Sequence, residues 1–447
     1  MADAVRAGAE AAAPRETRAY RHARRVLIAA AVIALLVTLV SCIKALNGDL
    51  KDADVWWRAG QRVLHDEPVI GIRDYRYPPA FAVFISPLCA LPRLAFFLVW
   101  YLINLGLFAL SLRLTARLLD ARSEWGDLPR LWLPALLVAV FAIDNLFLGQ
   151  TNILVMALVY LSLLALSRDR EWLAGLPLAG AIAVKVFPAP MIAYFAYRLR
   201  IKAVAATVFF CLLLMLVAPA PVRGLGRNYQ ETRAWWQRVV EPYLSRGTAG
   251  DWGQHALDFG NQSLQAVAHR YLTRVNAYVV ARDPAKALYV NFLDLNPEAV
   301  NRVVLVVFAL LGASFAAACG LRRPTDGLQQ AMECSLVVIL LLLVSALSWT
   351  YFFVMLLLPV ATAVRLLAGK RSLRPVTAWM LWAGLAGCAL APPLLTSAYA
   401  RALGHVFWAT MALYAGLALA CWEGRQGQAA DGADRPRQRC SAARSRD

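Results

Sequence analysis

The chain has 447 residues, of which 60% are hydrophobic, and a formal net charge of +18. Apolar runs of roughly 17 to 25 residues recur along it, which is the length that crosses the hydrocarbon core of a bilayer. This composition excludes a soluble domain and predicts an all-α polytopic membrane protein. The positive charge does not indicate nucleic-acid binding, because basic residues between apolar runs and in the tail are explained by membrane orientation and anionic lipid.

The first apolar run extends from Val26 to Leu46 and follows five arginines. It is longer than the core of a signal peptide, and no small-residue cleavage pattern follows it, so we expect a retained membrane anchor. The tails at residues 1–25 and 422–447 contain few apolar residues. We therefore expect both to be disordered cytoplasmic extensions.

Further apolar runs raise the expected number of membrane helices to about twelve. A transmembrane module at 26–222 is followed by an external loop at 223–300 and by C-terminal membrane helices at 301–421. The runs after the anchor lie near residues 93–112, 131–147, 151–167, 172–186, 187–197, 203–221, 302–320, 328–347, 350–368, 376–395 and 403–421.

The distribution of arginine and lysine predicts the orientation, because short cytoplasmic loops collect these residues. With both termini inside, the arginines near residues 113–130, 168–170, 198–202, 322–323 and 365–374 all fall in cytoplasmic loops. Counting Phe81–Leu91 as a crossing would place them outside. We therefore expect residues 77–92, which contain several prolines, to form a re-entrant or surface-lying segment.

Two large external loops, residues 47–92 and 223–300, frame any extracytoplasmic active site. Apolar residues at helical spacing predict an interfacial helix in each, one around Val55 to Leu64 and one around Trp235 to Leu244. Their tryptophans are expected in the headgroup region.

Four polar clusters fall on the external side under this topology. Three carboxylates follow the first membrane run, and Lys185 ends an apolar segment, where a buried ammonium is costly unless it snorkels or meets an anion. A phosphate would be such a partner. The clusters are Asp49 with Asp52 and Asp54, Asp144-Asn145 with Gly149-Gln150-Thr151-Asn152, Lys185, and Asn261-Gln262-Ser263.

With these motifs in this order, the sequence resembles glycosyltransferase family 87. This is a GT-C type family of polyprenyl-phosphate-mannose-dependent mannosyltransferases. The resemblance extends from about residue 26 to about residue 420. It rests on Asp52 with Val55-Trp56-Trp57 and Ala59-Gly60, Tyr77-Pro78-Pro79 with Pro87-Leu88, Gly149-Gln150-Thr151-Asn152, Lys185 with Pro188, and Gly260-Asn261-Gln262-Ser263-Leu264.

The resemblance implies a GT-C membrane enzyme that transfers a sugar, with mannose expected, from a polyprenyl-phosphate donor to a glycolipid or polysaccharide acceptor outside the cytoplasm. Asp52 would be the general base of an inverting displacement, with Asp54 or Asp49 as substitutes. The residues expected to bind substrate are Lys185, Arg58, Tyr77, Gln150, Asn152, Asn261, Gln262, His255 and Arg270.

A phosphate leaving group needs no general acid, so one essential carboxylate suffices, and we expect no metal and no cofactor. The eight cysteines show no CxxC spacing and predict neither a metal site nor a disulfide framework. Nucleic acid is not an expected partner.

Other interpretations of the same residues stay open. The loop carboxylates could be solvated charges, Asp144 a helix cap, the 149–152 and 261–263 segments simple turns, and His255 an ordinary surface residue. A secondary transporter or lipid-carrier translocator also suits twelve spans, although such proteins have paired halves with polar residues near the midplane. A structural subunit without activity is a third possibility.

Overall fold

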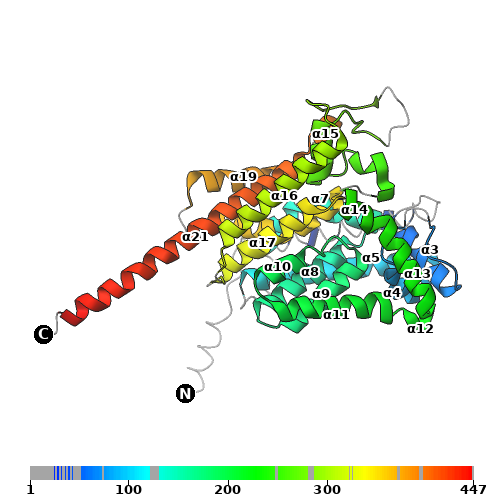
Figure 1. Ribbon diagram of the computed structural model, residues 1–447, viewed down its shortest axis with the longest axis horizontal. Helices are drawn as coiled ribbons and strands as arrows, with labels where there is room; N and C mark the ends of the chain where they lie inside the picture. Colours follow the sequence, from blue (N-terminus) through cyan, green and yellow to red (C-terminus); the bar gives the residue numbers. More distant parts are fainter. Residues whose placement is uncertain are drawn as a thin grey trace, which may run out of the picture.

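The computed structural model describes residues 52–72, 75–120, 130–246, 250–279, 286–321, 323–324, 326–369, 373–391 and 396–444, with isolated positions between 25 and 43. These residues form helices, with an isolated antiparallel bridge between Asn261 and Trp349. Figure 1 shows the long helices running in roughly the same direction. Asp49 and most of the predicted anchor lie outside the described residues.

Within the described residues, 6 helical segments are long and apolar enough to cross a membrane. This confirms an all-helical, multi-pass membrane protein. Four of the segments are α5 (Arg93–Leu119), α16 (Pro297–Cys319), α17 (Gly327–Val344) and the first part of α21 (His405–Arg444). The segment Ile201–Arg223 joins α11 (Ile201–Leu212), a π-helix (Leu213–Val217) and α12 (Ala220–Arg223). The segment Thr350–Ala368 joins a 3₁₀ helix (Thr350–Leu356) and α18 (Leu357–Ala368).

Several expected spans are occupied by shorter apolar helices. An α-helix rises 1.5 Å per residue, so a single helix of fewer than about 17 residues is too short to cross a bilayer core by itself. These helices are α4 (Pro79–Cys89), α7 (Ala139–Leu148), α8 (Asn152–Ser167), α9 (Glu171–Val184) and α19 (Pro375–Ala389), accompanied by α6 (Trp132–Leu137) and α10 (Met191–Tyr197).

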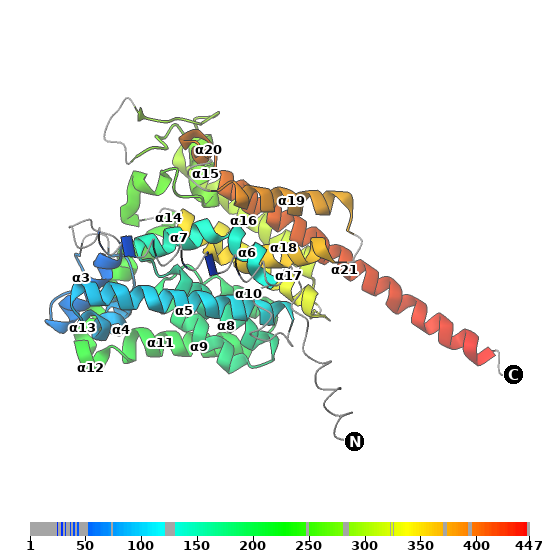
Figure 2. The same cartoon turned by 180° about the vertical axis from the view of Figure 1, so that it is seen from behind.

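The first half of the molecule is a bundle in which α8 packs against α5 and α9, and α9 against α11 (Figure 2). Gly175 of α9 makes the close approach to α11 possible, because a Cβ there would lie 2.5 Å from the Cβ of Ala206. The second half pairs α19 with α21, whose C-terminal end extends beyond the bundle (Figures 1 and 2). The sequence predicted a disordered tail there, but α21 continues to Arg444 through many helix-favouring Ala, Arg and Gln residues.

The first large loop, at residues 47–92, contains α3 (Asp52–Leu64), the amphipathic helix expected from the spacing of its apolar residues. Trp56 differs from the expectation of a headgroup position, because it is 1% exposed and packs edge-on against Tyr77. The helix therefore packs into the protein on this face. The α4 helix, inside the expected re-entrant segment, is only 11 residues long and lies against α3.

The second large loop, at residues 223–300, begins with α13 (Leu225–Trp235), a π-helix (Trp236–Val240) and α14 (Glu241–Arg246). It continues through a 3₁₀ segment (Gly250–Leu257) and α15 (Leu264–Leu272) to the membrane helix α16, and the short α20 (Ala398–Ala402) precedes α21. Helix is present at the position expected for the interfacial helix, and Trp236 is 46% exposed there. Trp235 is instead buried. In Figures 1 and 2, α3, α4, α12 and α13 gather at one end of the bundle, opposite the projecting end of α21.

Candidate active site

The turn between α7 and α8 carries Gly149, Gln150 and Thr151. Gly149 ends α7 with a φ of 66°, in the left-handed region that glycine adopts without strain. A Cβ on Gly149 would lie 2.6 Å from the Cβ of Ala53, so glycine allows α3 to pack directly on the turn. Trp100 of α5 also donates a hydrogen bond of 2.9 Å to the Gly149 carbonyl. These contacts hold Gln150 against the start of α3.

The Gln150 side chain connects three of the predicted site residues. Its Nε2 donates a hydrogen bond to the Asp52 carboxylate. Its Oε1 accepts hydrogen bonds from Tyr77 Oη at 3.2 Å and from Lys185 Nζ at 3.0 Å. Because both ends of the amide are engaged, the carboxylate and the ammonium are held on opposite sides of one buried side chain.

Lys185 follows the last residue of α9 and lies beside the start of α8. Its Nζ also donates a hydrogen bond of 2.9 Å to Asn152 Oδ1. Asn152 is fully buried and is the first residue of α8, and within the described chain its Nδ2 has no hydrogen-bond partner. The backbone N–H groups at a helix N-terminus add partial positive charge. Lysine, amide and helix end thus form one donor-rich surface.

Aromatic rings surround the ammonium group of Lys185. The Nζ atom lies 4.5 Å from the ring centre of Phe352, 5.2 Å from that of Tyr77 and 5.6 Å from that of Tyr351. Phe187 packs on Phe352 with ring centres 5.0 Å apart. Ring faces attract a cation and exclude water from it, which strengthens its attraction for an anion.

Two other predicted carboxylates have different surroundings. Asp144 lies within α7, not at its end, so it is not the helix cap considered from sequence. Asp54 is 2% exposed and forms ion pairs with Arg58 at 2.5 Å and Arg93 at 2.9 Å. Asp54 and Arg58 therefore neutralise each other on α3. The pair between Asp54 and Arg93 joins α3 to the start of α5.

Asn261 and Gln262 are buried and hydrogen-bonded to backbone groups at both ends of their amides. Asn261 donates to the carbonyls of Ala256 and Ala346 and accepts from the N–H groups of Ser263 and Ser348. Gln262 in the same way joins Phe259 and Arg401 to the start of α21. These bonds fix the Ser345–Trp349 turn, which leads directly to Tyr351 and Phe352.

Arg270 is also used within this support. Its guanidinium is 0% exposed and donates to the carbonyls of Ala402, Leu257, Asp258 and Asn261. Burial lowers the pKa of Arg270 to about 10, so the group remains charged at neutral pH. Its contacts are those of a loop anchor.

Comparison with known proteins now adds to the geometry. The sequence pattern of glycosyltransferase family 87 matches residues 75–346, which is more than half of the chain. The chain belongs to glycosyltransferase family 87. The matched range includes Tyr77, Gln150, Asn152 and Lys185, whereas Asp52 precedes it.

Two relatives from Mycobacterium tuberculosis are similar to parts of this family member. A polyprenol-phosphate-mannose-dependent α-(1-2)-phosphatidylinositol pentamannoside mannosyltransferase is 28% identical over 156 residues, 35% of this chain and 36% of the relative. A polyprenol-phosphate-mannose-dependent α-(1-2)-phosphatidylinositol mannoside mannosyltransferase is 29% identical over 196 residues, 40% of this chain and 43% of the relative. The alignments thus span less than half of each relative. No solved structure matches the chain.

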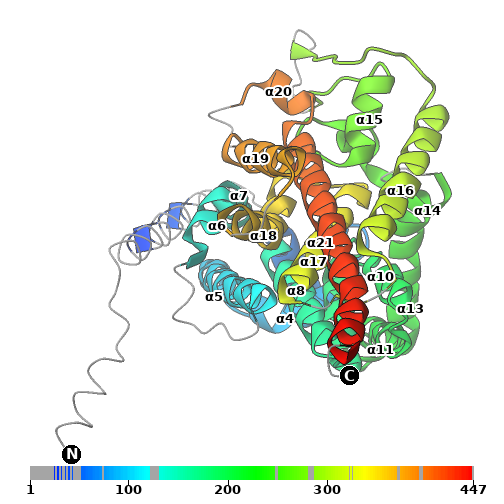
Figure 3. The same ribbon diagram turned by 90° about the vertical axis from the view of Figure 1, so that its left-hand side faces the viewer.

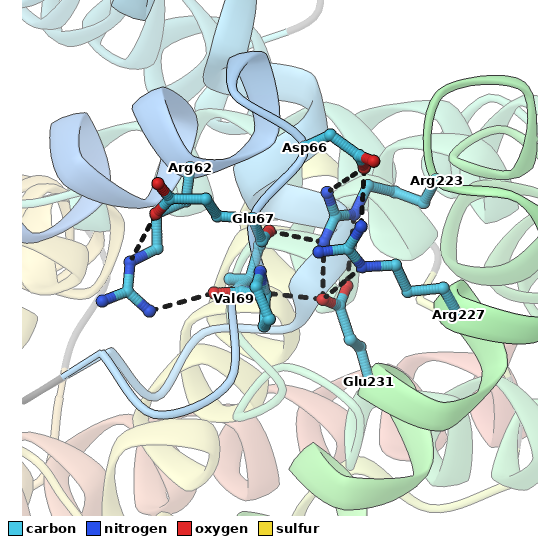
Figure 4. A network of polar contacts seen from close by, with 8 residues as sticks. Arg62, Asp66, Glu67, Val69, Arg223, Arg227 and Glu231 are labelled. Carbon is cyan, nitrogen blue, oxygen red and sulfur yellow. Dashed lines mark hydrogen bonds and ion pairs between the residues drawn. The ribbon is translucent and has the colours of Figure 1, made fainter.

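A network of polar contacts joins residues 62–69 of the first large loop to Arg223, Arg227 and Glu231 (Figure 4). Glu231 of α13 pairs with Arg223 at 2.6 Å and accepts a hydrogen bond of 3.1 Å from the Val69 N–H. Arg223 and Arg227 also pair with Asp66, at 3.5 and 2.6 Å. One turn further along α13, Trp235 Nε1 donates to the carbonyl of Arg76 at 2.9 Å. The second loop thus fixes the backbone immediately before Tyr77.

Some site features were not predicted. Tyr351 and Phe352 were treated as part of an apolar span, although the aromatic run from Trp349 to Phe353 was a possible signal. His255 is exposed on the 3₁₀ segment. Among the described residues, no group of three or more His, Cys, Asp or Glu side chains could hold a metal ion.

Proposed function

We propose that this family 87 member transfers mannose from a polyprenyl-phosphate donor to a glycolipid or glycan acceptor on the extracytoplasmic face, without a metal or cofactor. Family membership supports glycosyl transfer, and the names of the two relatives support the donor and a phosphatidylinositol mannoside as the type of acceptor. The observation that carries the proposal is the Gln150 amide, which joins the Asp52 carboxylate to the Lys185 ammonium.

Asp52 has the role of general base in this proposal. It accepts the proton of the acceptor hydroxyl as that oxygen attacks the anomeric carbon of the donor. The new carbon–oxygen bond forms while the bond from the anomeric carbon to the phosphate oxygen breaks, and the phosphate leaves with the electron pair. A single direct displacement inverts the configuration at the anomeric carbon.

Lys185 and Asn152 provide the binding surface for the donor phosphate. Lys185 supplies charge, and the buried Nδ2 of Asn152 supplies a donor without a partner in the described chain. Preorganised donors of this kind stabilise the negative charge that grows on a leaving group. The aromatic rings around Lys185 keep water away from the ion pair.

The proposed topology places both termini and the arginine-rich loops in the cytoplasm and includes about twelve crossings. Ion pairs between three of these loops support a common side. Asp169 pairs with Arg200 at 2.6 Å and with Arg323 at 3.3 Å. Gln150 precedes α8 and Lys185 follows α9, so both lie at the ends of these helices that are farthest from Asp169.

The direct experiment measures transfer by the purified wild-type protein in detergent. The donor is decaprenyl-phosphate mannose that carries the radiolabel in its mannose. It is incubated with the protein and phosphatidylinositol mannoside acceptors, and the lipid products are separated by thin-layer chromatography. We expect a labelled glycolipid one mannose larger than the acceptor. A folded wild-type protein that transfers neither mannose nor arabinose, but moves the donor lipid across vesicle membranes, would contradict the proposal and favour the translocator.

A further inference from the structure

A cavity of about 260 Å³ lies between α10, α16 and α17, three helices that Figure 3 places next to one another. Its lining includes Pro190, Tyr194, Phe308, Gly312, Phe315 and Leu341. The tyrosine hydroxyls on its wall are already used, because Tyr194 donates to Glu333 at 2.7 Å and Tyr197 to the Gly320 carbonyl at 2.8 Å. The wall therefore offers carbon surface to a ligand.

This cavity adjoins the turn that follows Lys185 in the chain. Pro190, on its wall, lies at the end of the tight turn that begins after Lys185, where Met191 N–H donates to the Pro188 carbonyl at 3.0 Å. Val344, also on the wall, is the last residue of α17 before the segment leading to Phe352. The segments that carry Pro190 and follow Val344 also meet at Phe187 and Phe352, whose rings pack together.

The direction of the cavity leads away from the phosphate surface. Its α17 wall extends from Val337 to Val344, which is about 10 Å at the helical rise, toward the end of the bundle that carries Arg198. Side chains of α16 that do not line it, such as Leu305 and Leu310, are 64% and 62% exposed. In a membrane protein such side chains face lipid, and Gly312, which lines the cavity from the same helix, is also exposed, so a chain in the bilayer has access from this side.

We infer that this cavity holds the isoprenoid chain of the donor, with the phosphate on Lys185 and the first isoprene units between α10, α16 and α17. The inference rests on the proposed function. Gly312 is the position that keeps this path open. A Cβ there would meet no protein atom within 4 Å, so a larger side chain would occupy the path without displacing the helices.

The test compares Gly312→Leu with Gly106→Leu, a matched control on α5. Both glycines are exposed in membrane helices, and neither Cβ would meet a protein atom within 4 Å, but Gly106 does not line the cavity. The measured quantity is kcat/KM for a decaprenyl-phosphate mannose donor relative to that for a geranyl-phosphate mannose donor.

We expect this ratio to fall about tenfold in Gly312→Leu, because a few buried methylene contacts of the long chain are lost, and to stay at the wild-type value in Gly106→Leu. An unchanged ratio in a folded, active Gly312→Leu enzyme would overturn the inference. Equal loss with both donors would also overturn it, since the leucine would then act on the catalytic centre.

If the wild type transfers no sugar, the proposed function fails separately. The inference is then tested by photolabelling the wild type with benzophenone-bearing decaprenyl phosphate. Labelling of α10 and α16 that excess decaprenyl phosphate removes and excess phospholipid does not would support an isoprenoid site. Labelling elsewhere, or equal competition by phospholipid, would identify an ordinary lipid-facing crevice and contradict the inference.

Discussion

Gln150 joins the two charged groups of the candidate site by a single amide, because its nitrogen end faces Asp52 and its oxygen end faces Lys185 and Tyr77. A glutamine can satisfy both neighbours at once, since it carries a donor and an acceptor on one planar group. The carboxylate and ammonium are thus oriented before substrate binds. Preorganisation of this kind reduces the ordering cost of the reaction.

The role of Lys185 predicts the effect of Lys185→Gln. Loss of a charged hydrogen bond to the donor phosphate costs about 1.5–3 kcal/mol, so we expect the KM for the polyprenyl-phosphate donor to rise about tenfold to a hundredfold. The KM for the acceptor should change little. Lys202→Gln is the control, because Lys202 is exposed near the start of α11. An unchanged KM for the donor in Lys185→Gln would show that Lys185 does not bind the phosphate and has a purely structural role.

At the scale of elements, α13 acts on the site through the backbone of the first large loop. Its Glu231 accepts a hydrogen bond from the Val69 N–H (Figure 4). Its Trp235 donates to the carbonyl of Arg76, which precedes Tyr77. Tyr77 in turn contacts Gln150 and the Lys185 ammonium. The two large loops therefore form one support, although about 160 residues separate the bonded partners.

Trp235→Phe tests this support, because it removes the indole N–H that binds the Arg76 carbonyl and keeps most of the ring. A hydrogen bond of about 1 kcal/mol predicts a fall of about fivefold in kcat/KM for the donor. The neighbouring Trp236 is 46% exposed, so Trp236→Phe serves as the control. Equal kcat/KM values in the two variants, both folded, would show that α13 does not position Tyr77.

The helical elements were easier to predict than their ends. Hydrophobic runs correctly located α5, α16 and α17, because burial in lipid requires long apolar stretches. The break after α17 was predicted, but the change from the 3₁₀ helix (Thr350–Leu356) to α18 was not evident, since Tyr160 stabilises that junction from another helix by bonding to the Met355 carbonyl and the Leu358 N–H. Hydropathy carries no information about such distant partners.

Only part of the candidate site was predicted, because sequence patterns also carry no information about contacts between distant residues. Polar residues in an apolar sequence identified Asp52, Gln150, Asn152 and Lys185, which the structure brings together. Asn261, Gln262 and Arg270 stand out equally in the sequence, yet their polar groups bind loop carbonyls and N–H groups. Only tertiary contacts separate a polar residue that supports a site from one that lines it.

At the scale of the whole molecule, a buried ion pair joins the first half of the bundle to the second. Arg198, after α10, pairs with Glu333 of α17, and both side chains are nearly inaccessible. Arg198 also donates to the Gly320 carbonyl at the end of α16 at 2.7 Å. The pair lies at the end of α10 farthest from Lys185, so it supports the bundle and not the phosphate surface.

Glu333→Leu should strongly destabilise the protein, because it leaves the Arg198 charge buried without its partner, at a cost of about 3–5 kcal/mol. The double variant Arg198→Met/Glu333→Leu should recover much of this loss. Asp169→Asn should change stability by less than about 1 kcal/mol, because the Asp169 carboxylate, which pairs with Arg200 and Arg323, is 68% exposed. Thermal unfolding of the purified variants in one detergent measures all three, and equal Tm values for Glu333→Leu and wild type would refute a stabilising pair.

The central claim is that Asp52 is the base of a glycosyl transfer, and the most direct measurement compares Asp52→Asn with Asp54→Asn in the labelled-mannose assay. Both substitutions remove a carboxylate from the first turn of α3. We expect Asp52→Asn to lower kcat by about 10²–10⁴ without altering the Tm. Asp54→Asn should retain turnover but lower the Tm, because Arg58 and Arg93 lose their partner. Normal turnover by Asp52→Asn, or its loss only in Asp54→Asn, would contradict the account.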